Sequence, residues 1–436
     1  MWLLLLLVTA YRVWVVANSG LNLYVDEAQY WYWAQDLDWG YYSKPPVIAV
    51  LIAMTTGACG DSEFCVRLGS LLLYPLSAAL LFLVTRKLFN SQIALLAAVL
   101  FVTLPAVSLS ATLISTDVAL LFCWTLALYA FVFALDSDSL DDWLLLGVAL
   151  GVGMLSKYTM GIFLVSALVY VLAARRWDLL RNWKAWLAVI LMLAIFSPTL
   201  WWNWQHGFPT LQHTAAIAQG TPGLLHWDEL LEFWGGQFGV FGVLLLPLLL
   251  WGGAKAQIAH KTLLLSFTLP FVLLISLQAL LGRANANWAV PAYVAGTILT
   301  AAWLGGEGKR GLFGTALLFN IALGLLVYHP ALLNHLLHTD VQKRLKGWDS
   351  LGQQYLRIQQ QYPDALLLSE GRDVLSMLAY YARPAGLQGV SWNPHHQLRH
   401  HYDLVTRLDD KVGNDFLLVT PTAPDAELSA FFQSVR

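Results

Sequence analysis

The sequence predicts an α-helical polytopic membrane protein of about eleven transmembrane helices, followed by a small α/β domain outside the membrane. Three observations lead to this fold class. Of the 436 residues, 58% are apolar and only 12% are charged, whereas a soluble domain carries roughly 25% charged residues. The mean hydropathy is +0.59. The apolar residues also gather in separate runs, and the charged residues are concentrated near the carboxy terminus.

The distribution of charge predicts two domains. Residues 1–330 contain 31 Asp, Glu, Lys and Arg residues, and residues 331–436 contain 21 in a third of that length. We therefore expect a membrane body over 1–330 and a soluble α/β domain over 331–436, with the boundary near His329 and Pro330. The net charge of −2 gives none of the basic footprint of a nucleic-acid-binding protein.

Apolar runs define the expected spans. Residues 1–18 lack the basic start and the cleavage site of a signal peptide and contain Arg12, so we interpret them as an uncleaved first span. Two of the later runs flank Lys157 and are short for a bilayer of about 30 Å, so they are candidates for a re-entrant pair. The ten later runs lie at about 66–84, 92–112, 117–135, 143–156, 160–174, 185–200, 235–254, 262–281, 288–305 and 311–329.

Positive charge in the loops sets the expected orientation. The loops on one side contain only three basic residues, Lys44, Lys157 and Arg283, so that side is expected to be extracytoplasmic. The amino terminus is then cytoplasmic and the carboxy-terminal domain lies outside. Four aspartates between 136 and 142 fall on the cytoplasmic side, but acidic residues carry little weight in this rule. The basic residues of the cytoplasmic side are Arg86, Lys87, Arg175, Arg176, Arg181, Lys184, Lys255, Lys261, Lys309 and Arg310.

The regions outside the membrane differ between the two faces. Two outer loops are long, at about 19–64 and 201–233, and long loops on one face are a common place for function. The cytoplasmic loops are short, and no GxxxxGK[ST] segment occurs, so ATP is not expected to drive the reaction.

In the soluble domain we expect helices over 341–361 and 372–382 and buried strands at 365–368 and 416–419. The histidine pairs at 395–396 and 400–401 are interpreted as solvated or structural residues, so no metal site is predicted.

The first outer loop contains an acidic pair and a lysine. Asp26 is expected to cap a helix whose aromatic face lies in the membrane interface, and Gly40 ends that helix. The following Lys44-Pro45-Pro46 holds the ammonium group at the mouth of the next span. One interpretation of Asp26, Glu27 and Lys44 is capping and headgroup contact. The other is a general base beside a cationic phosphate clamp.

Two further charges interrupt apolar runs. Asp117 follows Ser115-Thr116, and Lys157 lies between two short runs. A charge at mid-bilayer costs roughly 2.5–3.5 kcal/mol on insertion scales, so such residues are functional candidates. The alternative is a structural ion pair between the two. Both lie on the outer face in the expected topology, as do Asp26, Glu27 and Lys44, and this convergence favours a shared site.

Three weaker features lie in other outer segments. The aromatic and amide-rich residues 201–207, which include His206, suit either sugar stacking or a membrane-interface belt. Arg283 is either a second phosphate contact or an interface anchor. Cys59 and Cys65 are close enough in sequence to form a disulfide if their loop faces an oxidising space.

Five stretches together resemble the lipid-linked sugar transferases of the GT-C superfamily. The closest branch is bacterial glycosyltransferase family 39, which includes the dolichyl-phosphate-mannose protein mannosyltransferases and is allied to the aminoarabinose–lipid A transferases. The matching stretches are residues 26–31 (DEAQYW), 40–46 (GYYSKPP), 115–117 (STD), 155–159 (LSKYT) and 287–293 (NWAVPAY).

The resemblance implies a GT-C-like fold and an inverting transfer from a polyprenyl-phosphate sugar at the periplasmic face of a bacterial inner membrane. Asp26 matches the acidic residue that serves as the base, with Glu27 beside it. Lys44 matches the phosphate-binding lysine, and Asp117 and Lys157 match polar positions that line the cavity. No nucleotide sugar is implied.

The predicted function is therefore an inverting glycosyltransferase without a cofactor. Its donor is a polyprenyl-phosphate sugar, and its acceptor is lipid A, a polysaccharide or a protein. A transporter or flippase of an anionic lipid is the alternative, and a non-catalytic assembly partner is a third. The predicted site has three groups. They are catalytic Asp26, Glu27 and Asp117, phosphate-binding Lys44, Lys157 and Arg283, and substrate-binding Tyr30, Tyr42, Tyr158, His206 and Trp288.

Overall fold

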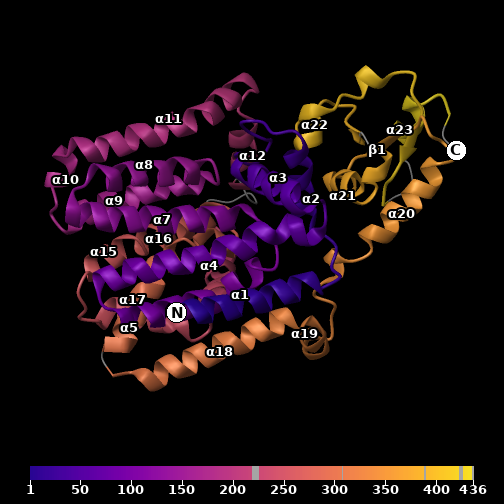
Figure 1. Cartoon of the computed structure of the whole chain (residues 1–436). Coiled ribbons are helices and arrows are strands. Elements are labelled where there is room, and N and C mark those ends of the chain that lie inside the picture. The colour runs from indigo at the N-terminus through magenta and orange to yellow at the C-terminus, as the bar shows by residue number, and fades with distance from the viewer. Residues whose placement is uncertain (219–224, 307, 387–388, 422–425, 435–436) are drawn as a thin grey trace.

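A computed structural model describes residues 1–436 except 219–224, 307, 387–388, 422–425 and 435–436. Helices lie side by side in one bundle, and the carboxy-terminal residues form a unit at one end of it (Figure 1). The helices before residue 330 are α1 (Trp2–Ala17), α2 (Val25–Gln35), α3 (Val47–Cys59), α4 (Glu63–Leu88), α5 (Ser91–Thr103), α6 (Pro105–Ser110), α7 (Thr116–Ser137), α8 (Leu140–Met154), the 3-10 helix η1 (Tyr158–Gly161), α9 (Ile162–Ala173), α10 (Asp178–Arg181), α11 (Trp183–Gln205), α12 (Pro209–Ala218), α13 (Trp227–Phe241), α14 (Leu245–Lys255), α15 (Lys261–Ser266), α16 (Leu269–Leu281), η2 (Ala286–Ala289), α17 (Ala292–Gly306) and α18 (Arg310–Tyr328).

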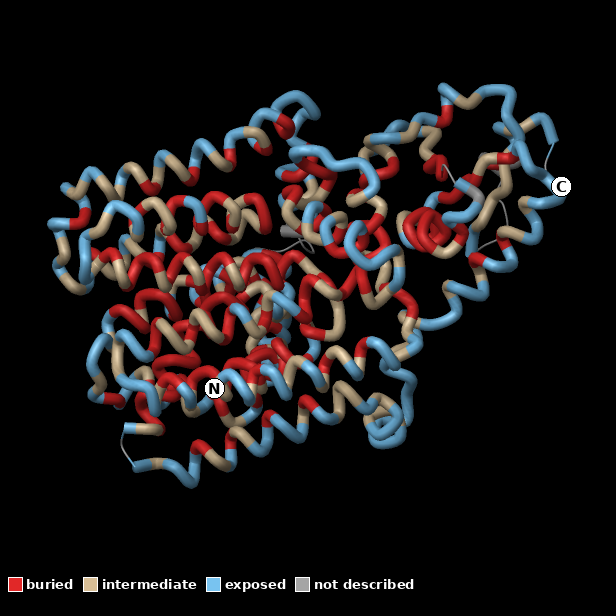
Figure 2. The backbone as a smooth tube through the Cα atoms, in the orientation of Figure 1, coloured by how far each residue is buried: buried red, intermediate tan, exposed pale blue. Residues whose placement is uncertain are grey.

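The bundle has the helices of a multi-pass membrane protein. Among the described residues, five helical segments are long and apolar enough to cross a bilayer: α4, α7, α11, α15 with α16, and α18. The bent pair α13 and α14 makes a sixth if it is one span. Helix α7 is central, with 72% of its most apolar stretch buried, whereas α11 and α18 are peripheral, with 28% and 22% buried (Figure 2).

The run at 235–254 is not the straight span that we expected. Helices α13 and α14 meet at an angle of 98°. Gly242 follows α13 with a φ of +118°, a backbone conformation that side chains rarely adopt. A Cβ atom there would also lie 2.5 Å from Oδ1 of Asn320 in α18. The close packing of α18 and the positive φ of this glycine together end the helix.

The run at 92–112 also differs from a continuous span. It breaks between α5 and α6, where Leu104 has the extended backbone (φ −54°, ψ +136°) that a residue before proline favours. Pro105 then begins α6.

The first outer loop contains more packed structure than the sequence indicated. Residues 47–59, expected to be part of a loop, form the apolar helix α3. Helix α2 begins at Val25, so Asp26 lies in its first turn, and Tyr24 rather than Asp26 is the N-cap. The expected aromatic interface face is also wrong, because Tyr30, Trp31 and Trp33 are buried in protein.

The cytoplasmic side of the expected topology contains the four aspartates that conflicted with the positive charges. Lys184 Nζ lies 2.7 Å from Asp138 Oδ2, and Lys87 Nζ pairs with Asp136. Asp136 and Asp138 therefore share one end of the bundle with the basic loops, and these ion pairs partly neutralise their charges.

The carboxy-terminal unit is a small α/β structure. Strand β1 pairs in parallel with both neighbours, in the order β2-β1-β3, with Leu367 opposite Gly389 and Leu417. The expected strands and the helix from Arg372 are present, whereas β2 was not predicted. Its elements are α19 (Pro330–Leu337), η3 (Lys343–Leu345), α20 (Trp348–Gln359), β1 (Leu366–Ser369), α21 (Arg372–Tyr381), η4 (Arg383–Ala385), β2 (Gly389–Ser391), α22 (His401–Val405), η5 (Asp409–Lys411), β3 (Phe416–Leu418) and α23 (Ala426–Phe431).

Helix α21 docks this unit onto the bundle. Its residues Met377 and Tyr380 belong to the same buried core as the membrane helices. The rings of Tyr380 and Trp31 in α2 meet edge to face with centroids 5.0 Å apart. A disulfide joins Cys59 and Cys65, and the carbonyl of Asp61 between them accepts hydrogen bonds from Tyr380 Oη and Arg383 Nη2 at 2.9 and 3.0 Å.

Candidate active site

Glu27 is held deep in the protein beside Arg67. Both residues are only 1% exposed, and Arg67 donates from Nε and Nη2 to the two carboxylate oxygens at 3.0 and 2.8 Å. The backbone N–H groups of Tyr24 and Ile114 each donate to the same carboxylate at 2.8 Å. A buried charge needs such partners, and these four hydrogen bonds fix the start of α2 against α4 and the residues before α7.

Asp26 has a different environment from its neighbour. Its side chain is 42% exposed, and its Oδ1 accepts a hydrogen bond of 2.9 Å from Nη1 of Arg372 in α21. Among the described residues, none donates to Oδ2. The same guanidinium donates to Oε1 of Gln29, one turn further along α2. The carboxyl-terminal unit therefore contributes a cation to the acidic start of α2.

Lys44 lies in a turn that the surrounding helices fix on both sides. The backbone N–H of Tyr41 donates to the Lys44 carbonyl at 3.0 Å, and that of Val47 donates to the Leu155 carbonyl at 3.0 Å. On the other side, Gly40 lies against Trp202 of α11, where a Cβ atom would be 2.5 Å from Cε3 of the indole. The turn is thus packed between α11 and the residues before Lys157.

The ammonium group of Lys44 is unneutralised. Among the described residues, no carboxylate lies within ion-pair distance of its Nζ. Burial, and then repulsion by Lys157, lower the pKa of Lys44 to about 8, against the opposing attraction of Asp26 and Asp117. Arg372 lowers the pKa further. All five charges therefore act on one region at the end of the bundle.

Asp117, Lys157 and Asn287 form one hydrogen-bonded group. Lys157 Nζ donates to Asp117 Oδ1 at 2.6 Å, and Asn287 Nδ2 donates to Oδ2 at 2.7 Å. The two charged side chains are 13% and 10% exposed. Ser115 caps α7 and accepts the Asp117 backbone N–H, so the carboxylate sits on the first turn of the central helix. This is the ion pair that the sequence offered as the structural alternative.

The four aromatic residues predicted to bind substrate have different surroundings. Tyr30 is buried near the charges: burial raises its pKa well above the usual value, and so do the nearby Asp26 and Asp117. Tyr42 Oη donates to the Leu398 carbonyl of the carboxy-terminal unit, and the Tyr158 hydroxyl accepts from Asn203 of α11 at 3.2 Å. Trp288 is half-buried beside Asn287 in η2.

Two of the predicted site residues, Arg283 and His206, do not contact the charged residues described above. Arg283 is exposed and makes no ion pair with any described residue. His206 is also exposed; it stacks on Trp202 with centroids 4.2 Å apart, and its Nδ1 lies 2.8 Å from the Trp202 carbonyl. These contacts fix the end of α11 rather than the charged region.

Sequence reasoning missed three residues of the region. Arg372 is separated from Asp26 by 346 positions. The sequence feature that could have identified it was a polar turn at the carboxyl end of a predicted buried strand. Asn287 lies in one of the matching stretches, which was its signal. His213 of α12 lies beside Tyr42 with ring centroids 4.9 Å apart. Burial and the charge of Lys44 lower the pKa of His213 to about 4.

The other histidines do not form a metal centre. Among the described residues, no three His, Cys, Asp or Glu side chains gather where they could hold an ion. His400 and His401, expected to be solvated or structural, are both 6% exposed. The ring of His401 packs edge to face against Trp33 and Tyr41, so it forms part of the contact between the two domains.

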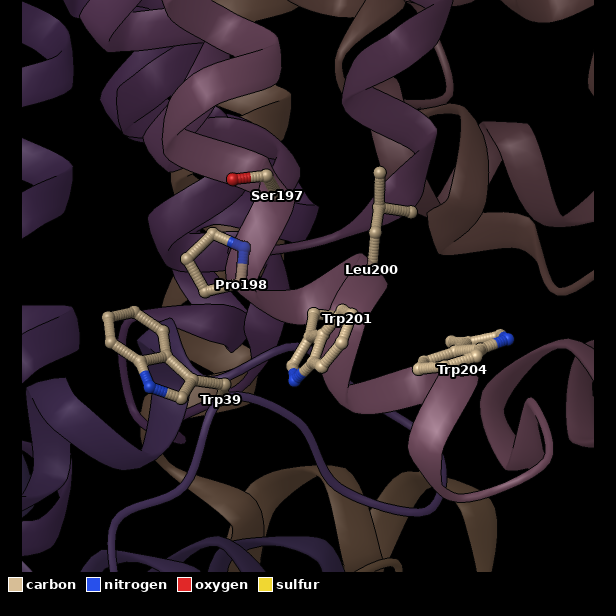
Figure 3. A pocket seen from close by; sticks show the side chains of 6 residues that line it. All are labelled: Trp39, Ser197, Pro198, Leu200, Trp201 and Trp204. Atoms are coloured by element: carbon tan, nitrogen blue, oxygen red, sulfur yellow. The ribbon is translucent and has the colours of Figure 1, made fainter.

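An apolar pocket of about 550 Å³ lies between the first outer loop and α11 (Figure 3). Trp39 from the first outer loop faces Pro198, Leu200, Trp201 and Trp204 of α11 across it. Its lining contains no charged residue, so it is separate from the cluster of Asp26, Lys44 and Asp117. The Trp39 carbonyl accepts the Thr199 hydroxyl at 2.6 Å, which joins the loop to α11.

Residues 43–202 match the family described as dolichyl-phosphate-mannose-protein mannosyltransferase. Over 398 residues the chain is 33% identical to the lipid A galacturonosyltransferase RgtD of Rhizobium johnstonii, covering 86% of this chain and 81% of that protein. The chain belongs to this family of GT-C glycosyltransferases. A further relative, 32% identical over 36% of the chain and 30% of its own length, is the undecaprenyl phosphate-α-4-amino-4-deoxy-L-arabinose arabinosyl transferase of Pseudomonas aeruginosa.

Solved structures support the fold of this glycosyltransferase. ArnT from Cupriavidus metallidurans bound to undecaprenyl phosphate superposes with a TM-score of 0.69 at 18% identity, covering 92% of this chain and 86% of that one. The Archaeoglobus fulgidus oligosaccharyltransferase superposes with a TM-score of 0.54 at 14% identity, covering 87% and 64%. At these identities the likeness concerns the fold alone, and it agrees with the GT-C-like architecture expected from the sequence.

Proposed function

We propose that this glycosyltransferase moves a sugar from a polyprenyl-monophosphate carrier to lipid A or the attached polysaccharide at the periplasmic face of the bacterial inner membrane. The relatives support both substrates, since one is named for lipid A and another for an undecaprenyl phosphate sugar. Polyprenyl-phosphate galacturonate is the first donor to test, because RgtD is named a galacturonosyltransferase. One observation of the structure supports this chemistry: the ammonium group of Lys44, which has no ion-pair partner among the described residues, and the partly exposed carboxylate of Asp26 interact electrostatically.

Lys44 is proposed to hold the donor phosphate. When the glycosidic bond breaks, negative charge grows on the departing phosphate, and a fixed cation there lowers the barrier. Lys44 suits this role because no described carboxylate pairs with it, so its charge is available to a ligand. Lys157 was a second candidate, but its ammonium is already bonded to Asp117. We propose no clamp role for Arg283.

Asp26 is proposed as the general base. The acceptor hydroxyl attacks the anomeric carbon and gives its proton to Asp26, while the bond from that carbon to the phosphate oxygen breaks and polyprenyl phosphate leaves. Attack opposite the leaving group inverts the anomeric centre. The free Oδ2 and the partial exposure of Asp26 provide the hydrogen-bond access that a base requires.

The remaining predicted residues receive other proposed roles. Glu27 anchors α2 through Arg67, because both of its oxygens already accept hydrogen bonds. Asp117 is proposed to hold Lys157 in place, and Asn287 to hold Asp117. Tyr30, Tyr42, Tyr158 and Trp288 remain proposed sugar contacts, and His206 is proposed to support α11 instead.

The finer topology is also a proposal. Eleven spans with a cytoplasmic amino terminus and a periplasmic carboxy-terminal unit place the charged region at the outer membrane surface. The basic loops at the opposite end of the bundle support this orientation. The Cys59–Cys65 disulfide also supports it, because disulfides persist in the oxidising periplasm and are rare in the cytosol.

The decisive experiment measures donor binding and sugar transfer separately in nanodiscs. Polyprenyl-phosphate galacturonate retained by the protein is detected by mass spectrometry, and transfer to lipid A is measured with the same donor. Lys44→Ala is expected to lose the donor, whereas Asp26→Asn is expected to keep the donor and lose transfer. Lys255→Ala removes an exposed lysine at the end of α14 and should change neither. If Asp26→Asn transfers sugar normally, the base assignment is wrong.

A further inference from the structure

A second cationic site lies next to Asp26 on the side of the carboxy-terminal unit. It is a pocket of about 450 Å³ lined by Lys343, Arg344, Lys346 and Arg372, together with Asp373, Tyr24, Val25 and Trp348. Four cations and one carboxylate give its lining a formal charge of +3. The volume lies within the range of about 300–1,000 Å³ typical of small-molecule sites.

The pocket is joined to the catalytic region by Arg372. This residue lines the pocket, and its Nη1 lies 2.9 Å from Asp26 Oδ1. Val25, the residue before Asp26, lines the pocket as well. Lys44 does not. Asp26 is therefore bonded to a residue of this pocket, and its charge also acts on Lys44, which lies outside the pocket.

Two of the four cations of the pocket make no ion pair with any described residue. Lys343 and Arg344 are exposed, and their side chains make no ion pair with any described residue. Lys346 is shared with Asp340, whose Oδ2 lies 2.7 Å away. Trp348 and Tyr24 add aromatic surface suited to a sugar ring.

Two hydrogen bonds attach the pocket to the segment between α1 and α2. The backbone N–H of Asn22, five residues after α1 ends, donates to the Leu345 carbonyl at 2.9 Å, and the N–H of Trp348 donates to Asn22 Oδ1 at 2.9 Å. Helix α19, which precedes the pocket residues, exposes Leu332, Leu336 and Leu337 at more than half of their surface. Such an exposed apolar helix suits the membrane interface.

We propose that this pocket binds the anionic headgroup of the acceptor lipid, with phosphate or carboxylate groups on the cations and the acceptor hydroxyl directed toward Asp26. The base must reach the acceptor hydroxyl, and Asp26 contacts Arg372 of this pocket while its charge acts on Lys44. Guanidinium and ammonium groups bind such oxyanions through charge-assisted hydrogen bonds. This inference rests on the proposed function and assigns the acceptor side of the same active site.

The test compares acceptor and donor binding in the full-length protein. The double variant Lys343→Gln/Arg344→Gln leaves Arg372 and Asp26 intact. We expect its KM for bisphosphorylated lipid A to rise at least tenfold with kcat little changed, and its retention of the polyprenyl-phosphate donor to be unaltered. Arg357→Gln, which removes an exposed cation of α20 outside the pocket, is the matched control and should behave as wild type.

Two comparisons make the result decisive. Lipid A freed of phosphate carries neither phosphate nor carboxylate, so the variant and wild type are expected to bind it alike; a difference that persists overturns the assignment of the pocket to an anionic headgroup. Vesicles of phosphatidylglycerol test for a general lipid contact. An unchanged KM in the double variant, or an equal loss of phosphatidylglycerol binding, overturns the acceptor assignment. If wild-type protein neither binds nor glycosylates lipid A, the proposed function is wrong. If wild-type protein glycosylates lipid A but the double variant has an unchanged KM, only the acceptor assignment is wrong.

Discussion

Asp26 and Glu27 show how two adjacent carboxylates acquire different environments. Successive side chains on a helix point about 100° apart, so one can face the core while the next faces outward. Glu27 faces inward, where Arg67 and two backbone N–H groups satisfy it. Asp26 faces outward, with a single cation on Oδ1. The identity of the residue does not separate them; the direction of the side chain does.

The depressed pKa of Lys44 predicts a pH dependence of donor binding. A lysine whose pKa is about 8 is charged below pH 8 and loses its proton above it, and a phosphate clamp requires the charged form. Donor affinity is therefore expected to fall about tenfold per pH unit between pH 8 and 10. His213, with a pKa near 4, stays neutral over this range. Equilibrium binding of polyprenyl phosphate across the pH range measures the effect.

Lys44→Arg is the control for this dependence. A guanidinium keeps its charge over the whole range, so the variant's affinity should be flat with pH even if its absolute value differs. An equal decline in wild type and Lys44→Arg would assign the titration to another group.

At the scale of elements, helix α2 is held in place by contacts with α4, with the segment before it and with the carboxy-terminal unit. Arg67 ties its first turn to α4, and Arg67 also donates from Nη2 to the Asn22 carbonyl at 2.7 Å, which fixes the segment before α2. The other side of α2 packs on the carboxy-terminal unit, where the ring centroids of Tyr32 and of Tyr402 in α22 lie 4.9 Å apart. Asp26 is thus presented by a helix that is immobilised on both faces.

Breaking the buried ion pair should destabilise this arrangement. Arg67→Met leaves the Glu27 carboxylate buried without its partner, and such a change typically costs about 3–5 kcal/mol. Adding Glu27→Gln removes the unpaired charge and should recover part of the loss. Thermal unfolding in detergent, followed by tryptophan fluorescence, measures both. If Arg67→Met unfolds at the wild-type temperature, the pair does not anchor α2.

Sequence patterns predict elements where the pattern is local. Strands β1 and β3 follow from apolar runs bounded by Pro, Asp and Gly, whereas β2 has only one strongly apolar residue, Val390, and left no such run. The bend at Gly242 was missed because the apolar run continues through it. In the site, Asp26 and Lys44 were recognisable from motifs, but the contact with Arg372 depends on how two distant segments dock.

At the scale of the whole molecule, the carboxy-terminal unit completes the site. It supplies all four cations of the proposed acceptor pocket, and one of them, Arg372, also contacts Asp26. Its attachment to the bundle includes contacts around α2, α21 and the loop between Cys59 and Cys65. Asp61 in that loop accepts from Trp31 Nε1 at 2.6 Å through Oδ1, and its carbonyl accepts from Tyr380 and Arg383.

Removing the disulfide should loosen this attachment. In Cys59→Ser/Cys65→Ser the loop that presents Asp61 is no longer closed covalently, so α21 is expected to exchange its amide hydrogens faster than in wild type, while α7 is unchanged. Cys123→Ala removes the buried thiol of α7 and is the control for loss of a cysteine. Hydrogen exchange with mass spectrometry measures both helices, and unchanged protection of α21 would show that the disulfide is not required for docking.

The position of the disulfide has a consequence for how the enzyme matures after membrane insertion. The bond closes the loop that carries the docking contacts, and it forms only where thiols are oxidised. A newly inserted chain would therefore have all its membrane helices before its catalytic region is aligned. Full activity would appear only after export and oxidation, so that a cell deficient in thiol oxidation would accumulate inserted but immature enzyme.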